Sequence, residues 1–581
     1  MTQTASQNTA AVDPVTVEVL KNEMVSITEE IAFVIMRTAR SPLLKAGDFA
    51  TAVADRQGRV VGALTTYAIW FYHLMLQNVL AKFGDALKPG DVIVSNDPWA
   101  ATSHLPDVAA VAPVFHDGAL AGFVCTYSHH SDIGGRFGGG VSSIPTSIFE
   151  EGIRIPLTKV RDAGVVNEGA LGVVLANVRN PDEWRADLEA KFAGCTAGGR
   201  AMAELIARYG LGTFDACCDK ILDQGEKKMR ALLRQIPDGV YSESASLTDE
   251  ALPAPARITM AMTIKDGHAT VDFTGSSPQV PNALNVPIQR MGGALSSIMR
   301  AAGWGVPGNL GDYRAVTVIA PERTIVNPVF PAAVGARATT RHVVHTLISR
   351  AVAKAMSATA EVPSAGNAVL QFAGGGSTGT AFVIVDIISS GWGGRADRDG
   401  IDGIADGLGG VVSSEILESQ YPIIVEGFGY VPDTEGAGKY RGSLAVFRKW
   451  KFLAEGHAIV RRHEYRDAPG MSGGAAGKAG RAIVNQGKPD EKEFPKASHV
   501  HMHIQPGDTI YLECTASGGY GSPAARDPNA VLADVKDQKI SVAGAADRYG
   551  VVIDPKTLKV DPEATRVLRA KGHAGIVGKA S

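Results

Sequence analysis

The chain has 581 residues, 45% of them hydrophobic and 20% charged, with a formal net charge of -3 at pH 7. This length is enough for about two to four domains, and the near-neutral charge excludes the basic surplus with which proteins bind nucleic acid or anionic lipid. No apolar run reaches about 18 residues, and residues 1–11 lack a signal-peptide pattern. We therefore expect a cytoplasmic protein without nucleic-acid or membrane partners, whose residues 1–11 form a disordered lead-in.

The cysteines agree with a reducing compartment. They form an odd, scattered set without a CxxC pair, and they are Cys125, Cys195, Cys217, Cys218 and Cys514. A disulfide framework, a zinc knuckle and a dithiol redox site are therefore not expected.

The first predicted elements are a long helix and several strands. Asp13 and Pro14 resemble a helix start, and apolar residues then recur at three- and four-residue spacings as far as Val34. This pattern predicts a helix over residues 13–40, which the Ser41-Pro42 step ends. Apolar runs bounded by turn residues then predict strands over residues 49–54, 92–94, 108–115 and 120–127.

Farther along the chain the pattern changes from helical to mostly β. Helices are predicted over residues 182–209, 220–235, 335–356 and 527–536, a hairpin over 256–275, and short strands within 421–516. Because helices and strands segregate, we predict an α+β, multi-layer fold with a helix-rich N-terminal half and a glycine-rich, mostly β C-terminal part. The expected divisions are an N-terminal α+β region with the candidate site (12–245), a central α/β region (246–420) and a C-terminal, mostly β region with a late helix (421–581).

The candidate chemistry lies in two polar segments that follow predicted strands. His104 and Asp107 belong to the first segment, and His129 and His130 to the second. Imidazole and carboxylate groups on two loops beyond strand ends can converge on one cation. Asp48, at the start of another strand, is a third acidic candidate. The residues alone leave open that these side chains are ordinary caps and strand-end residues.

Two further patterns invite a functional interpretation. His499, His501 and His503 alternate along one predicted strand, so they share a face and form either a metal site or a solvated edge. Residues 374–380 fit both GxGxxG and GxSxG, but an apolar β-branched strand follows, where each motif requires a helix. A phosphate-loop lysine is also missing, so we expect a glycine turn there and no ATP site or serine nucleophile.

Several segments match one protein family in the family's own order. They are Asn96-Asp97-Pro98, His104-Leu105-Pro106-Asp107, His129-His130-Ser131-Asp132-Ile133-Gly134-Gly135, residues 148–156, 272–280 and 436–442, Tyr421-Pro422, Gly518-Gly519-Tyr520-Gly521-Ser522-Pro523, and Tyr549-Gly550-Val551-Val552. The chain thus resembles the hydantoinase B, 5-oxoprolinase and ketone carboxylase family over roughly residues 13–553. The order in which these motifs follow one another along the chain is more specific to the family than any single motif.

This resemblance implies a reaction divided between two subunits. In the family, a hydantoinase A-like partner with an actin-like fold binds ATP-Mg and phosphorylates the substrate oxygen, and the B-type subunit completes hydrolysis or carboxylation. The family's metal ligands correspond to Asp48, His104, Asp107 and His129. One divalent metal (Zn, Mn or Fe) is therefore expected, which would polarise a substrate oxygen or activate a bound water. Further small subunits would accompany a carboxylase.

The chain departs from the family in two places. It has Ala100 and Ala101 where relatives usually have two glycines, and residues 67–76 are shorter and more aromatic than in relatives. Trp70, Phe71 and Tyr72 either form a packed helix face or border the pocket and favour an aromatic or bulky substrate. At most two of these three consecutive residues can line one site.

Three functions are compatible with these observations. We favour a subunit of an acetophenone-like ketone carboxylase, a ligase that acts on an O-phosphorylated enol, because the aromatic segment suits such a substrate. The alternative is the B subunit of an ATP-dependent hydantoinase, lactamase or 5-oxoprolinase, a hydrolase of cyclic amides. A non-catalytic scaffold subunit is the third interpretation, and the presence of all four candidate ligands argues against it.

Overall fold

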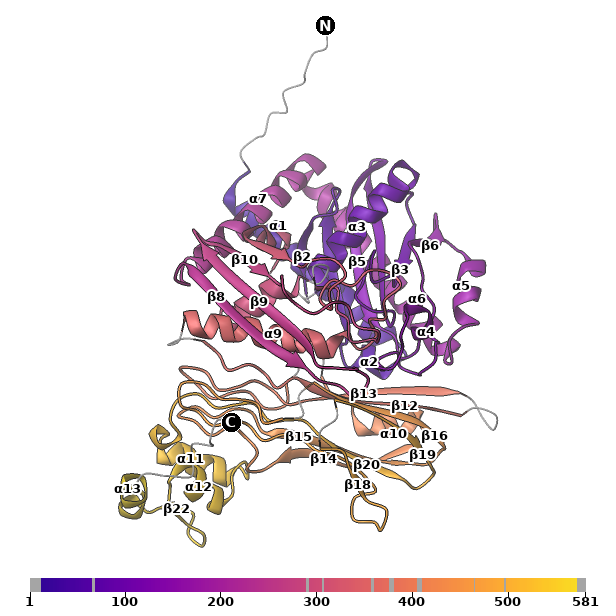
Figure 1. The fold of residues 1–581 in the computed structure, drawn as a ribbon. Helices are drawn as coiled ribbons and strands as arrows, with labels where there is room; N and C mark the ends of the chain where they lie inside the picture. Colours follow the sequence, from indigo (N-terminus) through magenta and orange to yellow (C-terminus); the bar gives the residue numbers. More distant parts are fainter. Residues whose placement is uncertain are drawn as a thin grey trace.

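The computed structural model describes residues 12–64, 68–288, 292–305, 308–356, 360–375, 381–404, 410–463, 466–495 and 498–571. Helices and several β-sheets combine in a mixed α+β fold (Figure 1), in agreement with the sequence. Within these ranges, no helix has both the length and the apolar character that crossing a membrane requires.

A seven-stranded antiparallel sheet forms the centre of the N-terminal part, with the strand order β2-β1-β5-β4-β3-β6-β7. The strands are β1 (Phe49–Asp55), β2 (Val60–Ala63), β3 (Val92–Ser95), β4 (Asp107–His116), β5 (Ala119–His129), β6 (Thr158–Asp162) and β7 (Val165–Val166). Asp117 and Gly118, both at positive φ, form the predicted turn between β4 and β5. The strands predicted from the apolar runs are therefore confirmed.

Long helices cover one face of this sheet. α1 (Pro14–Thr38) begins where the Asp13 carboxylate accepts a hydrogen bond from the Thr16 N–H at 3.2 Å, as the sequence predicts. α6 (Pro181–Tyr209) packs against α1, β4 and β5. α7 (Leu211–Leu233) starts before the predicted residue 220, because Gly210 at φ 80° turns the chain directly from α6 into the next helix.

The opposite face of the sheet carries α3 (Ile69–Phe83). Successive residues of β5 point to opposite faces: Thr126 approaches Cys195 of α6 at 4.0 Å, whereas the ring of Tyr127 stacks on Phe71 of α3 with centroids 5.6 Å apart. The aromatic segment is therefore helical from residue 69, and Tyr67 lies outside the described residues. Shorter helices of this part are α2 (Pro42–Lys45), η2 (Gly84–Ala86), α4 (Ile148–Glu151) and α5 (Glu168–Leu175).

A second, four-stranded sheet follows in the chain, with the order β11-β10-β9-β8. Its strands are β8 (Gly239–Leu247), β9 (Ala256–Lys265), β10 (His268–Asp272) and β11 (Val316–Ile319). β9 and β10 form the predicted hairpin, and β10 and β11 are parallel. α9 (Arg337–Ala355) packs on β8, β9 and α8 (Gly293–Ala301), while η4 (Leu310–Ala315) packs on α7.

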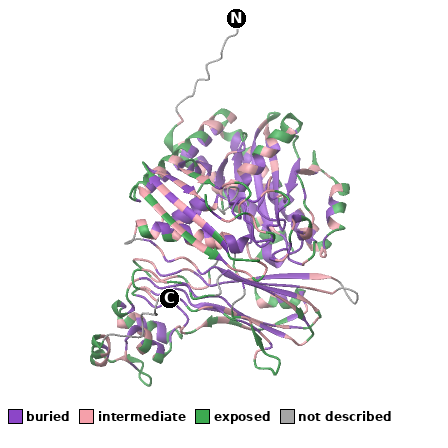
Figure 2. Cartoon of the chain, viewed as in Figure 1, coloured by how far each residue is buried: buried purple, intermediate pink, exposed green. Residues whose placement is uncertain are grey.

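Two antiparallel sheets share one core in the C-terminal part, in the lower half of Figures 1 and 2. One sheet has the order β13-β12-β16-β19, with β12 (Asn367–Gly374), β13 (Phe382–Ser389), β16 (Gly456–Arg462) and β19 (His499–Ile504). The other has the order β14-β15-β20-β17-β18, with β14 (Ile423–Val431), β15 (Ala445–Phe452), β17 (Ala482–Val484), β18 (Lys492–Glu493) and β20 (Thr509–Glu513). α10 (Ser414–Gln420) contacts β14. β12 and β13, which precede residue 420, thus share a sheet with β16 and β19, which follow it. The domain divisions expected from the sequence stay a prediction.

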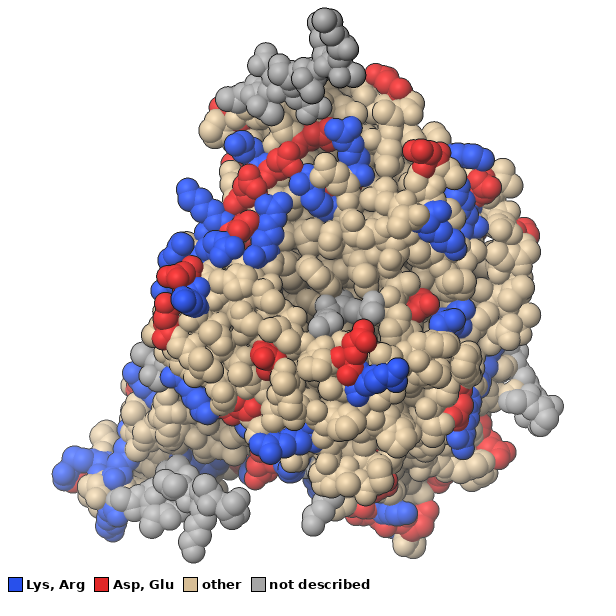
Figure 3. Space-filling model, turned by 45° about the horizontal axis from the view of Figure 1, so that its top comes forward, with Lys and Arg blue, Asp and Glu red and all other residues tan. Residues whose placement is uncertain are grey.

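A small helical unit ends the described chain. It contains η5 (Pro523–Ala525), the predicted late helix α11 (Pro528–Lys536), α12 (Val542–Tyr549), β21 (Ile553–Asp554), β22 (Lys559–Val560) and α13 (Pro562–Ala570). Val531, Tyr549 and Val551 form its buried core together with Ala437. On the face shown in Figure 3, basic and acidic side chains lie beside one another, in agreement with the net charge of -3.

Candidate metal centre

Three of the predicted metal ligands meet where β4 begins and β5 ends. Because the two strands are antiparallel, Asp107 at the start of β4 is paired directly with His129 at the end of β5. His104 reaches the same point from the turn before β4. One donor atom from each of these residues lies within 4.8 Å of the other two.

The neighbouring His130 points away from this cluster. Its Nε2 lies 2.8 Å from Nζ of Lys191, and its ring packs on Trp184 with centroids 4.8 Å apart. Both partners belong to α6, on the opposite face of the sheet. Of the two adjacent histidines, only His129 faces the cluster, as strand alternation predicts.

Asp48 lines the same cavity without joining the three-residue cluster. Its backbone oxygen accepts a hydrogen bond from the His129 N–H at 3.4 Å. Burial raises the pKa of the Asp48 carboxyl to about 7, and the nearby Asp107 adds to this shift. Direct binding of the metal by Asp48 stays a prediction.

The three clustered residues fit a divalent cation. Nε2 of His104 lies 2.9 Å from Oδ1 of Asp107, but it forms no hydrogen bond in the described structure, and neither does the buried Nδ1 of His129. A buried nitrogen without a partner costs roughly 1–3 kcal/mol. A cation that bonds both nitrogens and the Asp107 carboxylate would remove this cost. Two imidazoles and one carboxylate suit Zn, Mn or Fe.

The protonation states also suit metal binding, which requires neutral imidazoles and a charged carboxylate. Burial and the nearby Arg337 lower the pKa of His104 to about 4. Burial and His104 lower the pKa of His129 to about 3. Burial alone would raise the pKa of Asp107, but His104 and Arg337 outweigh it and hold this pKa well below its usual value.

Residues from distant parts of the chain hold the cluster in place. Nδ1 of His104 lies 3.2 Å from the carbonyl oxygen of Gly335, and the Gly335 N–H donates to Oε1 of Glu151 at 2.6 Å. Arg337 forms an ion pair with Asp107 and donates to Oγ of Ser103. The sequence alone did not predict these supports. Glu151 lies within the family-like segment 148–156, but Gly335 and Arg337 carried no signal beyond a predicted helix start.

The cluster opens into a cavity of about 70 Å³ between the N-terminal part and the C-terminal sheets. α9 contributes Arg337 and Arg341 to its wall, and β12 and β16 contribute Asn367, Gln371 and Arg461. The wall is thus rich in groups that donate hydrogen bonds.

The three aromatic residues have different environments. Phe71 lines the cavity. The Trp70 ring instead packs on Tyr313, with centroids 5.7 Å apart, and the fully buried Tyr72 donates from its hydroxyl to the Ala50 carbonyl at 2.6 Å. Of the three candidates, Phe71 alone lines this cavity, within the limit of two that consecutive helical positions allow. Trp70 is partly buried against the core and Tyr72 lies within it, and the effect of Phe71 on substrate choice stays a prediction.

The family model described as Hydantoinase B/oxoprolinase matches residues 13–523. The chain belongs to this family. The resemblance expected from the ordered motifs is thereby confirmed.

Named relatives of this hydantoinase B family chain include two kinds of enzyme. It is 30% identical to caprolactamase subunit beta of Pseudomonas jessenii over 96% of this chain and 99% of that protein. It is 24% identical to the acetophenone carboxylase delta subunit of Aromatoleum aromaticum over 97% and 90% of the two chains. The crystal structure of the ATP-dependent caprolactamase from Pseudomonas jessenii matches with a TM-score of 0.85 and 28% identity, over 97% of this chain and all of that one. Both enzyme types predicted from the sequence thus occur among the relatives.

The alternating histidines of β19 and the glycine cluster at residues 374–380 do not form comparable sites in the part of the chain that the structure describes. Nδ1 of His499 lies 2.9 Å from Asp249, Nε2 of His501 lies 3.3 Å from Oγ of Ser142, and His503 is exposed beside Glu455. The three rings therefore have separate partners. β12 ends at Gly374 and pairs with β13, as expected for a turn between strands, and residues 376–380 lie outside the described ranges.

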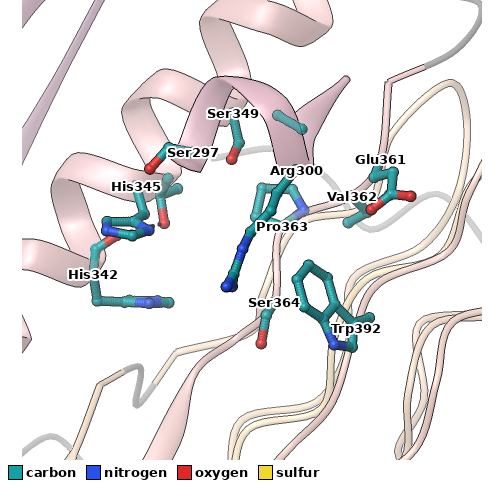
Figure 4. A pocket seen from close by; sticks show the side chains of 12 residues that line it. Ser297, Arg300, His342, His345, Ser349, Glu361, Val362, Pro363, Ser364 and Trp392 are labelled. Atoms are coloured by element: carbon teal, nitrogen blue, oxygen red, sulfur yellow. Dashed lines mark hydrogen bonds between the residues drawn. The ribbon is translucent and has the colours of Figure 1, made fainter. Parts of the chain in front are cut away.

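A second cavity of about 40 Å³ lies between α8 and α9, close to the first (Figure 4). Arg300 extends over the ring of Trp392, 5.4 Å from its centroid, and His342 faces the same space. His342 stacks on His463, and Nδ1 of His463 accepts from the N–H of Asn367 at 3.4 Å. His342 lines this second cavity and Asn367 lines the metal cavity, so His463 contacts one wall residue of each.

Proposed function

We propose that this chain is the metal-binding, active-site subunit of an ATP-dependent, multi-subunit enzyme. The observation that carries the proposal is the convergence of His104, Asp107 and His129, with two buried imidazole nitrogens left without hydrogen-bond partners. The subunit names of the relatives and the ATP dependence of the matching caprolactamase support it. ATP-Mg would bind to a hydantoinase A-like partner, since this chain has no phosphate-loop lysine after its glycine cluster.

A divalent cation at the cluster would supply a Lewis acid that polarises a substrate oxygen. The chain's own residues would position the reactants around it. Arg337 restrains the Asp107 carboxylate, and Asp48 lines the same cavity beside it. The cavity of about 70 Å³ is smaller than a typical ligand pocket of roughly 300 Å³, so side chains at its wall must move when substrate binds.

We propose ketone carboxylation as the reaction of this site. The carbon of an O-phosphorylated enol would form a bond to the carbon of bicarbonate activated as carboxyphosphate, both supplied by the partner subunit. The C–O bond to the phosphate of carboxyphosphate would break and release phosphate, and water would then remove the phosphoryl group from the ketone oxygen as a second phosphate. Phe71 supports this choice because it presents an aromatic ring at the cavity wall, and the likeness to an acetophenone carboxylase subunit agrees.

Hydrolysis of a cyclic amide is the second candidate. In that reaction water would add to the O-phosphorylated amide carbon at the same site. The ring C–N bond would then break as the nitrogen takes up a proton, and a second water would release phosphate from the resulting acyl phosphate to leave a free carboxylate. The likeness to the caprolactamase, in both sequence and structure, favours it. A scaffold role is the third hypothesis, and the intact donor cluster argues against it.

One experiment separates these functions. The complex with its ATP-binding partner would be assayed with ATP for incorporation of labelled bicarbonate into acetophenone and acetone, and for ring opening of caprolactam, hydantoin and 5-oxoproline. Bicarbonate incorporation that His104→Ala abolishes would support the carboxylase, and ring opening that the same variant abolishes would support the hydrolase. Full activity of the His104→Ala complex in either assay would contradict an active site on this chain.

A further inference from the structure

The metal cavity has more basic than acidic side chains. Three guanidinium groups line it, those of Arg337, Arg341 and Arg461, against the two carboxylates of Asp48 and Asp107. A divalent cation on the cluster would increase this positive surplus by two charges. Uncompensated charge in a low-dielectric interior is strongly unfavourable, so the cavity as a whole favours an anionic ligand.

Arg461 forms no ion pair at contact distance with the described residues, and Asp48 attracts it only from across the cavity. Arg461 is only 6% exposed, and its guanidinium donates a hydrogen bond to Oδ1 of Asn367 at 2.7 Å. Its Nε is buried without a hydrogen bond, and no ion pair links it to any other described residue. Arg337, by contrast, is already engaged by Asp107 and Ser103. Arg461 therefore remains available to an anion.

The electrostatic environment agrees with this availability. Burial and the neighbouring Arg341 and Arg337 lower the pKa of Arg461 to about 9. The charged guanidinium is thus held close to two like charges, and an anion between them would relieve the repulsion. Asn367 adds a neutral donor, because its amide oxygen accepts from Arg461 while its amide nitrogen forms no hydrogen bond in the described structure.

We propose that Arg461 and Arg341, assisted by Asn367, form an anion subsite beside the metal cluster, for a phosphoryl group carried by the substrate. Guanidinium groups bind phosphoryl oxygens through paired, charge-assisted hydrogen bonds. A ligand with two negative charges also balances the excess positive charge of the metal-loaded cavity better than a ligand with one. The identity of the phosphoryl carrier rests on the proposed function, whereas the subsite itself rests on the charges and contacts of these residues.

The subsite is tested by titrating inorganic phosphate into the purified, metal-loaded chain by calorimetry, at constant ionic strength maintained with chloride. Arg461→Gln should weaken phosphate binding by about tenfold or more. Arg461→Lys should give an intermediate loss, because an ammonium group keeps the charge but not the paired geometry. Arg481→Gln, which removes a surface guanidinium paired with Glu493, is the matched control and should bind phosphate as the wild type does.

Metal content and melting temperature would be measured for every variant. Failure of the wild type to bind phosphate at millimolar concentration, or equal affinity in the wild type and Arg461→Gln, would overturn the subsite. Acetate bound as tightly as phosphate, with the same dependence on Arg461, would overturn the assignment to a dianion. A wild-type chain that takes up no divalent metal would instead contradict the proposed function, and the phosphate comparison between variants would remain valid. If Arg461→Gln does not fold, the comparison rests on Arg461→Lys.

Discussion

Nδ1 of His104 lies 3.2 Å from the carbonyl oxygen of Gly335, a residue far away in the sequence. Since a carbonyl oxygen can only accept, His104 must carry its proton on Nδ1, which leaves the lone pair on Nε2. Nε2 is the atom that lies 2.9 Å from Asp107. The loop before α9 therefore selects the tautomer in which His104 can bind a cation.

Removal of His104 should remove the metal. The His104→Ala chain is expected to lose bound divalent metal and, in the complex, all turnover, while it remains folded. Elemental analysis and the partner-coupled assay measure both effects. His503→Ala, which changes an exposed histidine beside Glu455, is the control. Unchanged metal occupancy together with full activity of His104→Ala would contradict the site.

Glu151 should act on the metal through Gly335. Its Oε1 accepts from the N–H groups of Val334 at 2.8 Å and Gly335 at 2.6 Å, so Glu151→Ala frees the loop that orients His104. We expect metal affinity to fall by about 10- to 100-fold in a competition titration with a chelator. Glu151→Gln should retain most of the affinity, because burial raises the pKa of Glu151 to about 8 and a neutral amide still offers the accepting oxygen. Wild-type affinity in Glu151→Ala would show that the loop does not depend on this contact.

Phe71 should influence substrate choice, whereas its two aromatic neighbours should not. Phe71→Leu and Phe71→Ala remove aromatic contact at the cavity and are expected to weaken binding of an aromatic substrate by roughly 1–3 kcal/mol. Tyr72→Ala should cost about 3–5 kcal/mol of folding free energy, because this ring is fully buried in the core. Trp70→Ala should cost less, because Trp70 is partly buried and packs on Tyr313 at the edge of the core. The ratio of kcat/KM for aromatic against small aliphatic substrates, and the melting temperature, would be measured for each variant. A ratio unchanged in both Phe71 variants would remove the structural support for an aromatic ketone.

The chain without its partner should hydrolyse no ATP. Its glycine cluster at residues 374–376 precedes a strand instead of a helix, and no phosphate-loop lysine follows. Phosphate release would be measured for the isolated chain, for the partner and for their mixture, and only samples that contain the partner should be active. Robust ATPase activity of the isolated chain, retained through a further purification step, would contradict this division of labour.

Glu183 should make the stability of the fold depend on pH. Burial raises the pKa of this carboxyl to about 7 from the value of 4.5 that applies to the unfolded chain, and the hydroxyl of Tyr421 donates to it at 3.2 Å. A raised pKa means that the folded state binds the proton more tightly. The contribution of protonated Glu183 to the free energy of unfolding is therefore complete below pH 4.5. It declines as the pH rises through about 7, by at most roughly 3 kcal/mol.

Urea unfolding of the wild type and Glu183→Gln at pH 5 and pH 8 would measure this contribution. The amide cannot ionise, so Glu183→Gln should lose less stability between the two pH values than the wild type. Glu204→Gln, a change at an exposed position on the same helix, should leave the pH dependence as it is. Identical pH profiles for the wild type and Glu183→Gln would refute the contribution.

Local chemistry determined much of this protein from sequence alone. The Asp13 cap and the helical spacing after it predicted α1, and the Asp117-Gly118 turn predicted the β4–β5 hairpin, because both signals lie within a few residues. The hairpin in turn brings Asp107 and His129 together. The ordered motifs determined the family, since each can be recognised without knowledge of the fold.

Only the tertiary structure decided what surrounds the cluster. Gly335 and Arg337 reach it from the start of α9, and Arg461 reaches it from β16, in contacts that join residues far apart in the chain. The same long-range packing directs Phe71 to the cavity and places Tyr72 in the core. Such contacts leave no periodic or motif signal, because they depend on how whole sheets and helices pack and not on the spacing of neighbouring residues.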